Sequence, residues 1–131
     1  MATLTEGRHT AEFVVSEANG FRSRDEIVIE SGAGVIEPGT VLGLITANGK
    51  YKPATNTGAD GAQYASASAF TGGDATSAEV TVTGLTRDAE VKQSHLTYGS
   101  TIDAAAQRDT AHGQHATAGI IVRYGRAEKW P

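Results

Sequence analysis

Short apolar runs recur along the chain, and several of them alternate with polar positions or are rich in β-branched residues. Such runs predict β-strands when turn-forming residues separate them. The predicted strands cover residues 12–17, 21–31, 40–45, 63–70, 78–85 and 120–124. Asn19-Gly20, Pro38-Gly39 and Asn48-Gly49 lie between them and are typical turn sequences. The pattern therefore predicts a chain made mainly of short strands.

The clearest of these runs is TVLGLI, residues 40–45. Its apolar side chains would lie on both faces, which is typical of a central strand. Gly43 inside the run indicates a bulge or a close approach of another backbone segment. Asn48-Gly49 predicts a hairpin that returns through residues 50–52.

One helix is predicted within residues 101–119, where Ala104, Ala105 and Ala106 are strong helix formers. Gly113 or Gly119 could end this helix. Residues 87–98 predict either another strand or a strand-to-helix transition. The remaining Gly-, Ala-, Ser- and Thr-rich stretches between residues 53 and 79 predict loops around the strand at 63–70.

These elements predict a single α+β domain, mainly β, with one short helix. Residues 1–11 are polar and lack periodicity, so we expect a flexible N-terminal arm followed by a domain over residues 12–131. No apolar segment there has the pattern of a signal peptide, and no run reaches the length of a membrane span. We therefore expect no membrane partner.

Composition changes this picture in one respect. Alanine occurs 21 times, whereas Val, Ile, Leu and Phe together number 24 among 131 residues. A folded domain with so few large apolar residues has a thin core, and such domains often gain burial by oligomerising. The net charge of −4 argues against a general nucleic-acid binder, and the absence of cysteine excludes disulfides and thiolate metal sites.

Candidate chemistry is sparse. The chain has no phosphate-binding loop, no dinucleotide-binding glycine pattern and no nucleophile elbow. His112 and His115 have a spacing that could bring two imidazoles to one metal, but a polar helix end is the favoured interpretation. Asp60 precedes Gly61, a pair more typical of a turn than of a catalytic carboxylate. We expect no catalytic residue, metal or cofactor.

Three further features were considered as binding residues. Arg22, Arg24 and Asp25 form a dense charged cluster that could bind an anion or a partner, although a solvated strand edge is favoured. His95 is predicted to lie at the surface or in an interface. Trp130 either packs against the domain or is presented to a partner.

An ordered set of short segments gives the chain a resemblance to a known family. The segments are SRD (23–25), PGTVLGLI (38–45), DGAQ (60–63), RDAEV (87–91) and AGIIVR (118–123). In this order and spacing they resemble the bacteriophage head decoration proteins of the lambda type. The resemblance covers residues 12–123. It departs from the expected pattern at the small residues of YASASAF (64–70) and in the His-bearing segment before AGIIVR.

The resemblance implies a structural protein of the virion and not an enzyme. Proteins of this class are β-rich with a little helix, and they form homotrimers on the outer surface of the expanded phage head. At local threefold positions they clamp neighbouring major capsid subunits and stabilise the shell against internal DNA pressure. The chain would then be made in the host cytoplasm and act on the virion, with the major capsid protein of a tailed phage as its partner and no direct contact with nucleic acid.

The segment Glu12, Phe13, Val14, Val15 and Ser16 is the candidate capsid contact. It could add as a strand to an exposed edge of the major capsid protein, with its backbone supplying the hydrogen bonds. The alternative is that residues 12–17 form an ordinary strand of the domain's own sheet.

Two other function classes remain as alternatives. A trimeric β-rich nucleotide hydrolase would need a carboxylate–metal or phosphate-binding constellation, which the sequence lacks. A carbohydrate-binding or adhesin-like β module would usually expose several aromatic residues, and this chain has one Trp and four Tyr.

Overall fold

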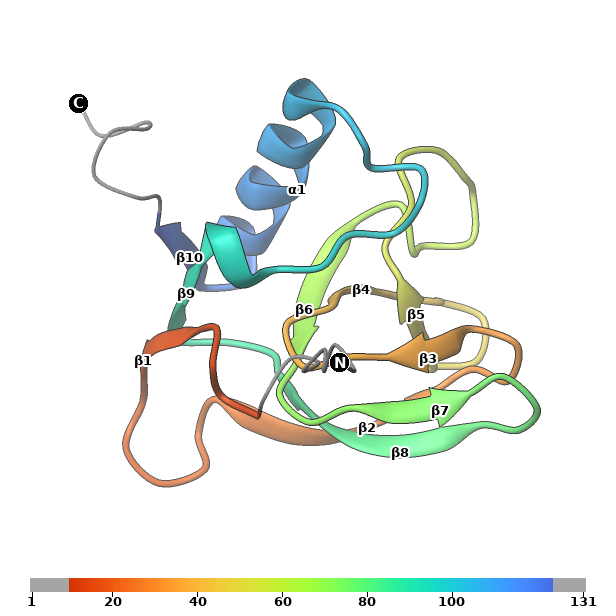
Figure 1. The fold of residues 1–131 in the computed structure, drawn as a ribbon, viewed down its shortest axis with the longest axis horizontal. Helices are drawn as coiled ribbons and strands as arrows, with labels where there is room; N and C mark the ends of the chain where they lie inside the picture. Colours follow the sequence, from red (N-terminus) through yellow and green to blue (C-terminus); the bar gives the residue numbers. More distant parts are fainter. Residues whose placement is uncertain (1–9, 124–131) are drawn as a thin grey trace, which may run out of the picture.

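The computed structural model describes residues 10–123 and shows a β-rich fold with one α-helix, α1 (Figure 1). This confirms the predicted fold class. The helix is Ala105–Thr117, and a single 3-10 turn, η1, covers Gln93–His95. The strands are β1 (Val14–Glu17), β2 (Arg24–Ile29), β3 (Gly34–Ile36), β4 (Val41–Leu44), β5 (Tyr51–Pro53), β6 (Ala65–Ala69), β7 (Gly73–Ala75), β8 (Val80–Leu85), β9 (Ala89–Lys92) and β10 (Ile120–Arg123).

Five strands close into a small barrel in the order β2-β5-β4-β6-β8. Strand β2 pairs with β8 along its whole length, and a parallel pairing of Ile29 with Tyr51 closes the ring. One apolar cluster of small or aliphatic residues lies between the barrel and the strands β3 and β7. Its buried members are Ile27, Ile29, Ile36, Leu42, Ala67, Ala69, Ala75 and Val82. Closure leaves few unpaired strand edges, and alanine fits where the barrel strands pack closely.

Strand β4 is central, as the sequence predicted, because it pairs with β5 on one side and β6 on the other. Gly43 is the point of close approach that its position indicated. A Cβ atom there would lie 2.6 Å from the Ala62 Cα. The hairpin between β4 and β5 at Asn48-Gly49 is also confirmed, with Gly49 at φ +72°.

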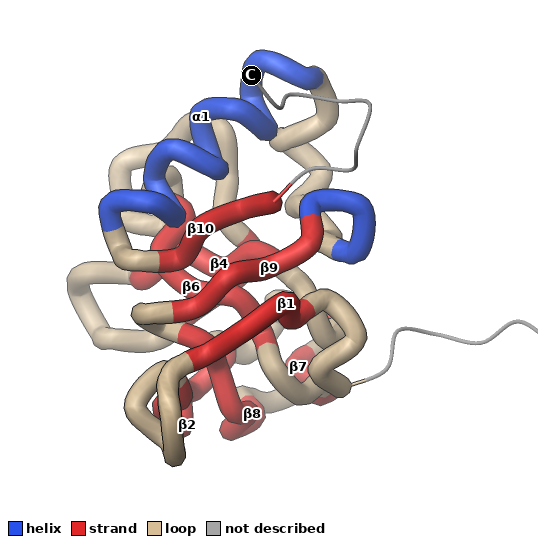
Figure 2. The backbone as a smooth tube through the Cα atoms, turned by 90° about the vertical axis from the view of Figure 1, so that its left-hand side faces the viewer, coloured by secondary structure: helices blue, strands red, loops and turns tan. Residues whose placement is uncertain are grey.

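A second region lies beside the barrel. Figure 2 shows β1, β9 and β10 side by side, with α1 next to β10. Strand β1 runs antiparallel to β9, and β10 runs parallel to β9. A second apolar cluster fills the space between this sheet, α1 and the barrel, and it includes Phe13, Val91, Leu96, Ala111 and Ile120.

The helix α1 falls inside the predicted segment. At its start the Gln107 side chain accepts hydrogen bonds from the backbone N–H groups of Asp103 (2.9 Å) and Ala104 (3.1 Å). At its end Gly119 takes φ +88°, and its N–H donates to the Ala116 carbonyl. A left-handed glycine after the last turn is a common helix terminator. Gly113 lies inside the helix and does not end it.

Sequence reasoning missed the two-stranded sheet of β3 and β7. Both strands have three residues and begin with glycine; β7 lies in a stretch predicted to be a loop, and β3 lies between two predicted strands. Their pairing depends on contacts between residues about forty positions apart, which no local pattern records. Residues 87–98 contain both predicted options, since β9 runs directly into η1.

Candidate functional site

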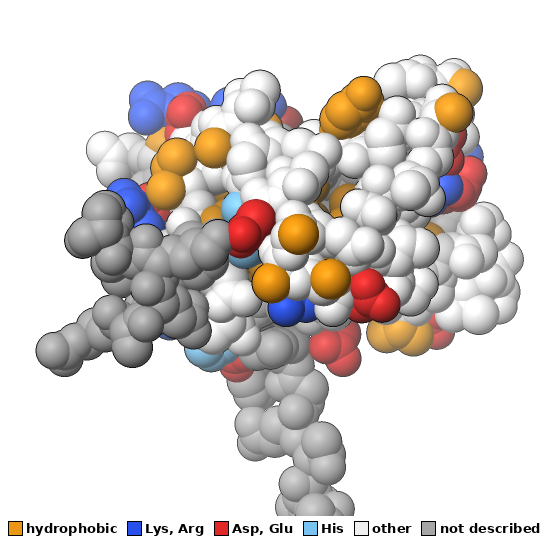
Figure 3. Space-filling view, turned by 90° about the horizontal axis from the view of Figure 1, so that it is seen from above, with side chains coloured by type: hydrophobic (Ala, Val, Ile, Leu, Met, Phe, Trp, Pro, Cys, Tyr) orange, Lys and Arg blue, Asp and Glu red, His pale blue; other side chains and the backbone are white. Residues whose placement is uncertain are grey.

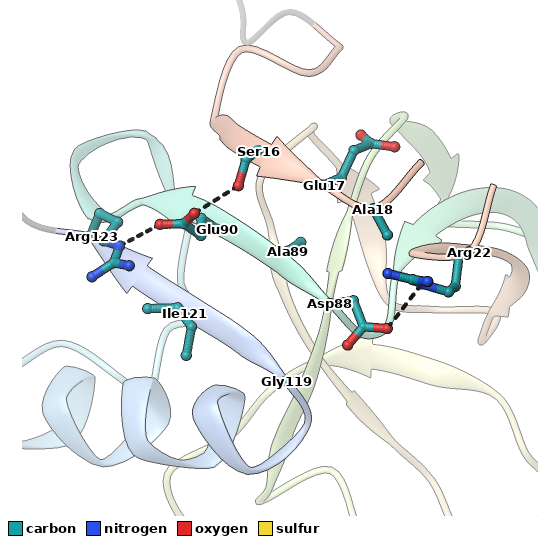
Figure 4. A pocket seen from close by; sticks show the side chains of 10 residues that line it. All are labelled: Ser16, Glu17, Ala18, Arg22, Asp88, Ala89, Glu90, Gly119, Ile121 and Arg123. Atoms are coloured by element: carbon teal, nitrogen blue, oxygen red, sulfur yellow. Dashed lines mark hydrogen bonds and ion pairs between the residues drawn. The ribbon is translucent and has the colours of Figure 1, made fainter. Parts of the chain in front are cut away.

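A groove of about 380 Å³ crosses the outer face of the β1–β9–β10 sheet (Figure 4). Ser16 and Glu17 reach it from β1, Glu90 from β9, and Ile121 and Arg123 from β10. Alternation explains this arrangement in β9 and β10, whereas β1 has an irregularity in its register with β9 between Val14 and Ser16. Residues such as Val91 and Ile120 point into the core, so their neighbours point outward.

Charges in the groove are paired with one another. The Glu90 carboxylate accepts hydrogen bonds from Arg123 Nε at 2.6 Å and from Ser16 Oγ at 2.8 Å. The arginine, and to a smaller extent the serine, hold the pKa of Glu90 below its ordinary value. At the other end, Arg22 Nε lies 3.5 Å from an Asp88 carboxylate oxygen. The contacts of Glu90 therefore link the three strands across the groove.

The predicted capsid-contact segment forms the edge of this sheet. Within residues 10–123, β1 pairs with β9 alone, so its other edge has no strand partner there. Phe13 is 1% exposed and belongs to the core, and Val14 packs against that core. Val15 is 49% exposed, Ser16 is exposed and Glu12 is half-buried. The strand is part of the domain's own sheet, and its outward-facing positions are Val15 and Ser16.

The charged cluster after β1 is more organised than a solvated strand edge. Arg24 donates two hydrogen bonds to Glu17, at 2.8 and 3.2 Å, and its guanidinium lies 4.0 Å from the centre of the Phe70 ring. Asp25 pairs with Arg87 and accepts a hydrogen bond from Thr86 Oγ1 at 2.8 Å. These contacts, with Arg87 first, hold the pKa of Asp25 below its ordinary value. The cluster fastens β1 and β8 to β2.

Phe21, in the loop between β1 and β2, is 78% exposed, the most exposed large apolar residue of the described chain. Sequence reasoning assigned no binding role to it. The sequence pattern placed Phe21 at the start of the predicted strand 21–31, directly after the Asn19-Gly20 turn, whereas β2 begins at Arg24 and leaves Phe21 in the loop.

The two helix histidines overturn an expectation. They were predicted to lie at a polar helix end, but His112 is 8% exposed and His115 is 1% exposed. His112 Nε2 lies 2.5 Å from the Tyr98 hydroxyl, and His115 Nε2 lies 2.9 Å from Ser68 Oγ. Burial lowers the pKa of His115 to about 4, so its imidazole is neutral at pH 7. Each ring contacts a hydroxyl, and the described residues hold no group of three or more His, Cys, Asp or Glu side chains able to bind a metal.

Asp60 lies in a turn, as predicted. Its carboxylate accepts hydrogen bonds from Lys52 Nζ at 2.6 Å and from the Ala62 N–H at 3.2 Å, which hold its pKa below the ordinary value. His95 is half-buried and lies 3.0 Å through Nδ1 from Ser94 Oγ. Trp130 lies outside the described residues.

The face seen from above in Figure 3 shows apolar side chains in small separate groups, with charged groups between and around them. No helix in residues 10–123 is both long and apolar enough to cross a membrane. Residues 10–123 offer a partner a strand edge with backbone donors and acceptors, a groove that contains paired charges, and the exposed ring of Phe21.

Comparison with known proteins shows the family of the chain. A search of curated protein sequences finds no match. The family model described as bacteriophage lambda head decoration protein D matches residues 3–120, which is most of the chain. This is the family that the ordered segments resembled, and its members are structural proteins of the phage head. The chain therefore belongs to the family of the bacteriophage lambda head decoration protein D.

Proposed function

We propose that this protein binds the outside of the expanded head of a tailed phage as a homotrimer and stabilises the shell against internal DNA pressure. The family match over residues 3–120 is the observation that carries the proposal. In this role the chain is made in the host cytoplasm and acts on the outer surface of the virion. Its partner is the major capsid protein.

The stabilising effect follows from mass action. A ligand that binds the assembled shell and not its dissociated subunits shifts the equilibrium toward the shell. A trimer presents the same contact three times, so the second and third contacts form within one complex and weak single contacts give tight binding. Expansion changes the spacing of capsid subunits, and a trimer matched to the expanded lattice would bind that form selectively.

The edge of β1 that has no strand partner within residues 10–123 supports β1 as the location of the capsid contact. An extended capsid segment could add beside β1, with backbone hydrogen bonds giving affinity and the side chains of Glu12, Val15 and Ser16 in contact. Phe13 and Val14 would act indirectly, since they fasten β1 to the core.

The direct test is co-sedimentation of the protein with undecorated capsids in their expanded and unexpanded forms. We expect it to pellet with expanded capsids and to raise the temperature at which they come apart. Absence from both pellets would contradict the proposed function.

Two exposed valines allow a matched test of the contact. Val15→Asp puts a charge on the proposed contact, while Val35→Asp puts one on the β3–β7 sheet, where Val35 is 69% exposed. We expect capsid binding to fall for Val15→Asp and to persist for Val35→Asp, with both variants folded by circular dichroism. Equal binding by the two variants would remove β1 from the contact.

Removal of residues 2–9 separates the arm from the strand while leaving Phe13 in place. Deletion that also took residues 10–16 would remove a core residue and so confuse binding with folding. If the arm contributes to the contact, the shortened protein stays folded and binds capsids more weakly.

Analytical ultracentrifugation of the full chain tests the trimer, and a monomer at micromolar concentration would contradict trimerisation in solution.

A further inference from the structure

The chain contains three tight turns in which glycine follows Asn or Asp: Asn19-Gly20, Asn48-Gly49 and Asp60-Gly61. Such sequences can form a cyclic imide, because glycine has no side chain to hinder attack by its backbone nitrogen on the preceding side-chain carbonyl. The sequence alone makes both Asn-Gly pairs equivalent candidates. The structure makes them different.

The reaction needs a particular geometry. The backbone nitrogen of glycine must lose its proton to solvent and reach Cγ of the preceding residue. A nitrogen–Cγ bond then forms, the bond from Cγ to the asparagine Nδ2 breaks, and ammonia leaves. Water opens the ring to give aspartate or isoaspartate. Hydrogen bonds that occupy the glycine N–H or fix the asparagine side chain oppose this sequence.

The turns at Asn48 and Asp60 carry those hydrogen bonds. The Gly49 N–H donates to the Ile45 carbonyl at 2.9 Å, and Asn48 Oδ1 accepts from the Lys50 N–H at 3.0 Å. The Gly61 N–H donates to Gln63 Oε1 at 2.8 Å, and Lys52 holds the Asp60 carboxylate. In both turns the nucleophile and the electrophile are each held by another group.

The turn at Asn19 is open. Asn19 and Gly20 are both exposed, and within residues 10–123 neither the Asn19 side chain nor the Gly20 N–H makes a hydrogen bond. Gly20 has φ +67°, with no atom within 4 Å of the position that a Cβ would take. The base of the loop is firm, because Ser23 Oγ accepts from the Ala18 N–H at 2.9 Å and donates to the Asp88 carbonyl at 2.8 Å. Hydrogen bonds thus hold the base of the loop but not the Asn19 side chain or the Gly20 N–H at its tip.

We propose that Asn19 is a site of spontaneous deamidation in the folded protein and that Asn48 is protected by its turn. The products place a carboxylate, and in the isoaspartyl form an additional backbone methylene, in the loop that carries Arg22 of the groove. The modification changes the charge of the chain beside β1 without any enzyme. Water is the single co-reactant.

Peptide mapping of the full-length protein tests this directly. Trypsin places Asn19 in the peptide of residues 9–22 and Asn48 in that of residues 25–50, and each peptide contains one asparagine. The folded protein is incubated in mildly alkaline buffer and digested at intervals. Replacement of NH by O on deamidation is then followed by mass spectrometry.

We expect Asn19 to react at least about fivefold faster than Asn48, the factor expected when one hydrogen bond of about 1 kcal/mol must open first. The same chain incubated in urea is the matched control, because both Asn-Gly pairs are unprotected there and their rates should converge. Equal rates in the folded protein would overturn the proposal. So would an Asn19 that stays intact while the unfolded chain reacts. Asn19→Gln should abolish the change in the first peptide and leave the second unaffected.

Discussion

The barrel and the side of the molecule that carries α1 are held together by different contacts. Inside the barrel, Ile29, Leu42 and Ala67 are fully buried, and the strands close on one another through backbone ladders. The α1 side also has an apolar cluster, but where α1 meets β6 buried polar contacts are added to it. Gln114 accepts a hydrogen bond from the Ala65 N–H at 2.7 Å, and His115 lies beside Ser68.

Because of this difference, we expect the two regions to respond differently to substitution and to pH. Apolar packing depends on shape and volume and is insensitive to pH. A buried imidazole that contacts a hydroxyl is stable while it is neutral, and its protonation in a dry interior is costly. Substitutions should therefore disturb the barrel most, whereas acid should act first on α1.

The largest effect is expected from a cavity in the barrel. Leu42→Ala removes a fully buried side chain and should lower the free energy of unfolding by about 3–4 kcal/mol. Urea denaturation at neutral pH measures this loss. Val35→Ala, at an exposed valine, serves as the control and should change stability by less than about 0.5 kcal/mol. Similar losses for the two variants would mean that the barrel interior is not the main source of stability.

Acid should weaken the α1 side by a comparable amount. Because the pKa of His115 is lowered from 6.5 to about 4 in the folded state, the unfolded chain binds a proton across this interval and the folded chain does not. Stability therefore falls as pH decreases from about 6.5 to about 4, by roughly 3 kcal/mol in total. Burial is the largest cause of this lowered pKa, and the electrostatic influence of His112 acts in the same direction.

The carboxylates act at lower pH and can be separated from this effect. Hydrogen bonds to their carboxylates lower the pKa of Asp25, Asp60, Asp74 and Glu90, so their contributions are present above the ordinary carboxyl pKa and are lost as pH falls through the lowered pKa. Urea denaturation between pH 6.5 and 4.5 thus reports mainly on histidine. His115→Asn should flatten the pH dependence in this interval. An unaltered slope in this variant would show that another group titrates.

Backbone crowding in the barrel gives the next effect. In Gly43→Ala the new Cβ would lie 2.6 Å from the Ala62 Cα, and a backbone atom cannot rotate away as a side-chain end can. We expect a loss of about 2 kcal/mol, typical of overpacking in a close-packed interior. The midpoint of thermal unfolding measures it, and an unchanged midpoint would show that the loop carrying Ala62 yields freely.

Local patterns in the sequence were sufficient for elements that local chemistry determines. The run at 40–45 between two glycine turns became β4, and the alanines before Gln107 begin a helix that ends at Thr117, before the left-handed Gly119. Strands β3 and β7 were missed because short glycine-led segments become strands only through their partner. The order of the barrel strands likewise depends on pairings between distant residues.

The side chains that face a partner were harder to predict than the fold. Residues 12–17 were open to two interpretations, and the pattern EFVVSE does not show that Phe13 is buried while Val15 is exposed. His112 and His115 looked polar because histidine usually is, but spacing of three along a helix also brings both rings to one inward face. Their hydroxyl partners, Tyr98 and Ser68, come from other elements. Sequence order does not record such contacts.

The smallest predicted effect compares a glycine of the barrel with a glycine of α1. Glycine-to-alanine substitution should lower the stability at Gly43 and raise it at Gly113. Gly113 lies inside the helix, is exposed, and has no atom within 4 Å of the position that a Cβ would take. Alanine there restricts the unfolded chain and favours helix, so Gly113→Ala should raise the free energy of unfolding by about 0.5–1 kcal/mol. Thermal unfolding of the two glycine variants side by side measures both signs. A loss of stability in Gly113→Ala would indicate that this face of α1 is packed against a neighbour, and a second copy of the chain could then be tested by ultracentrifugation of the same variant.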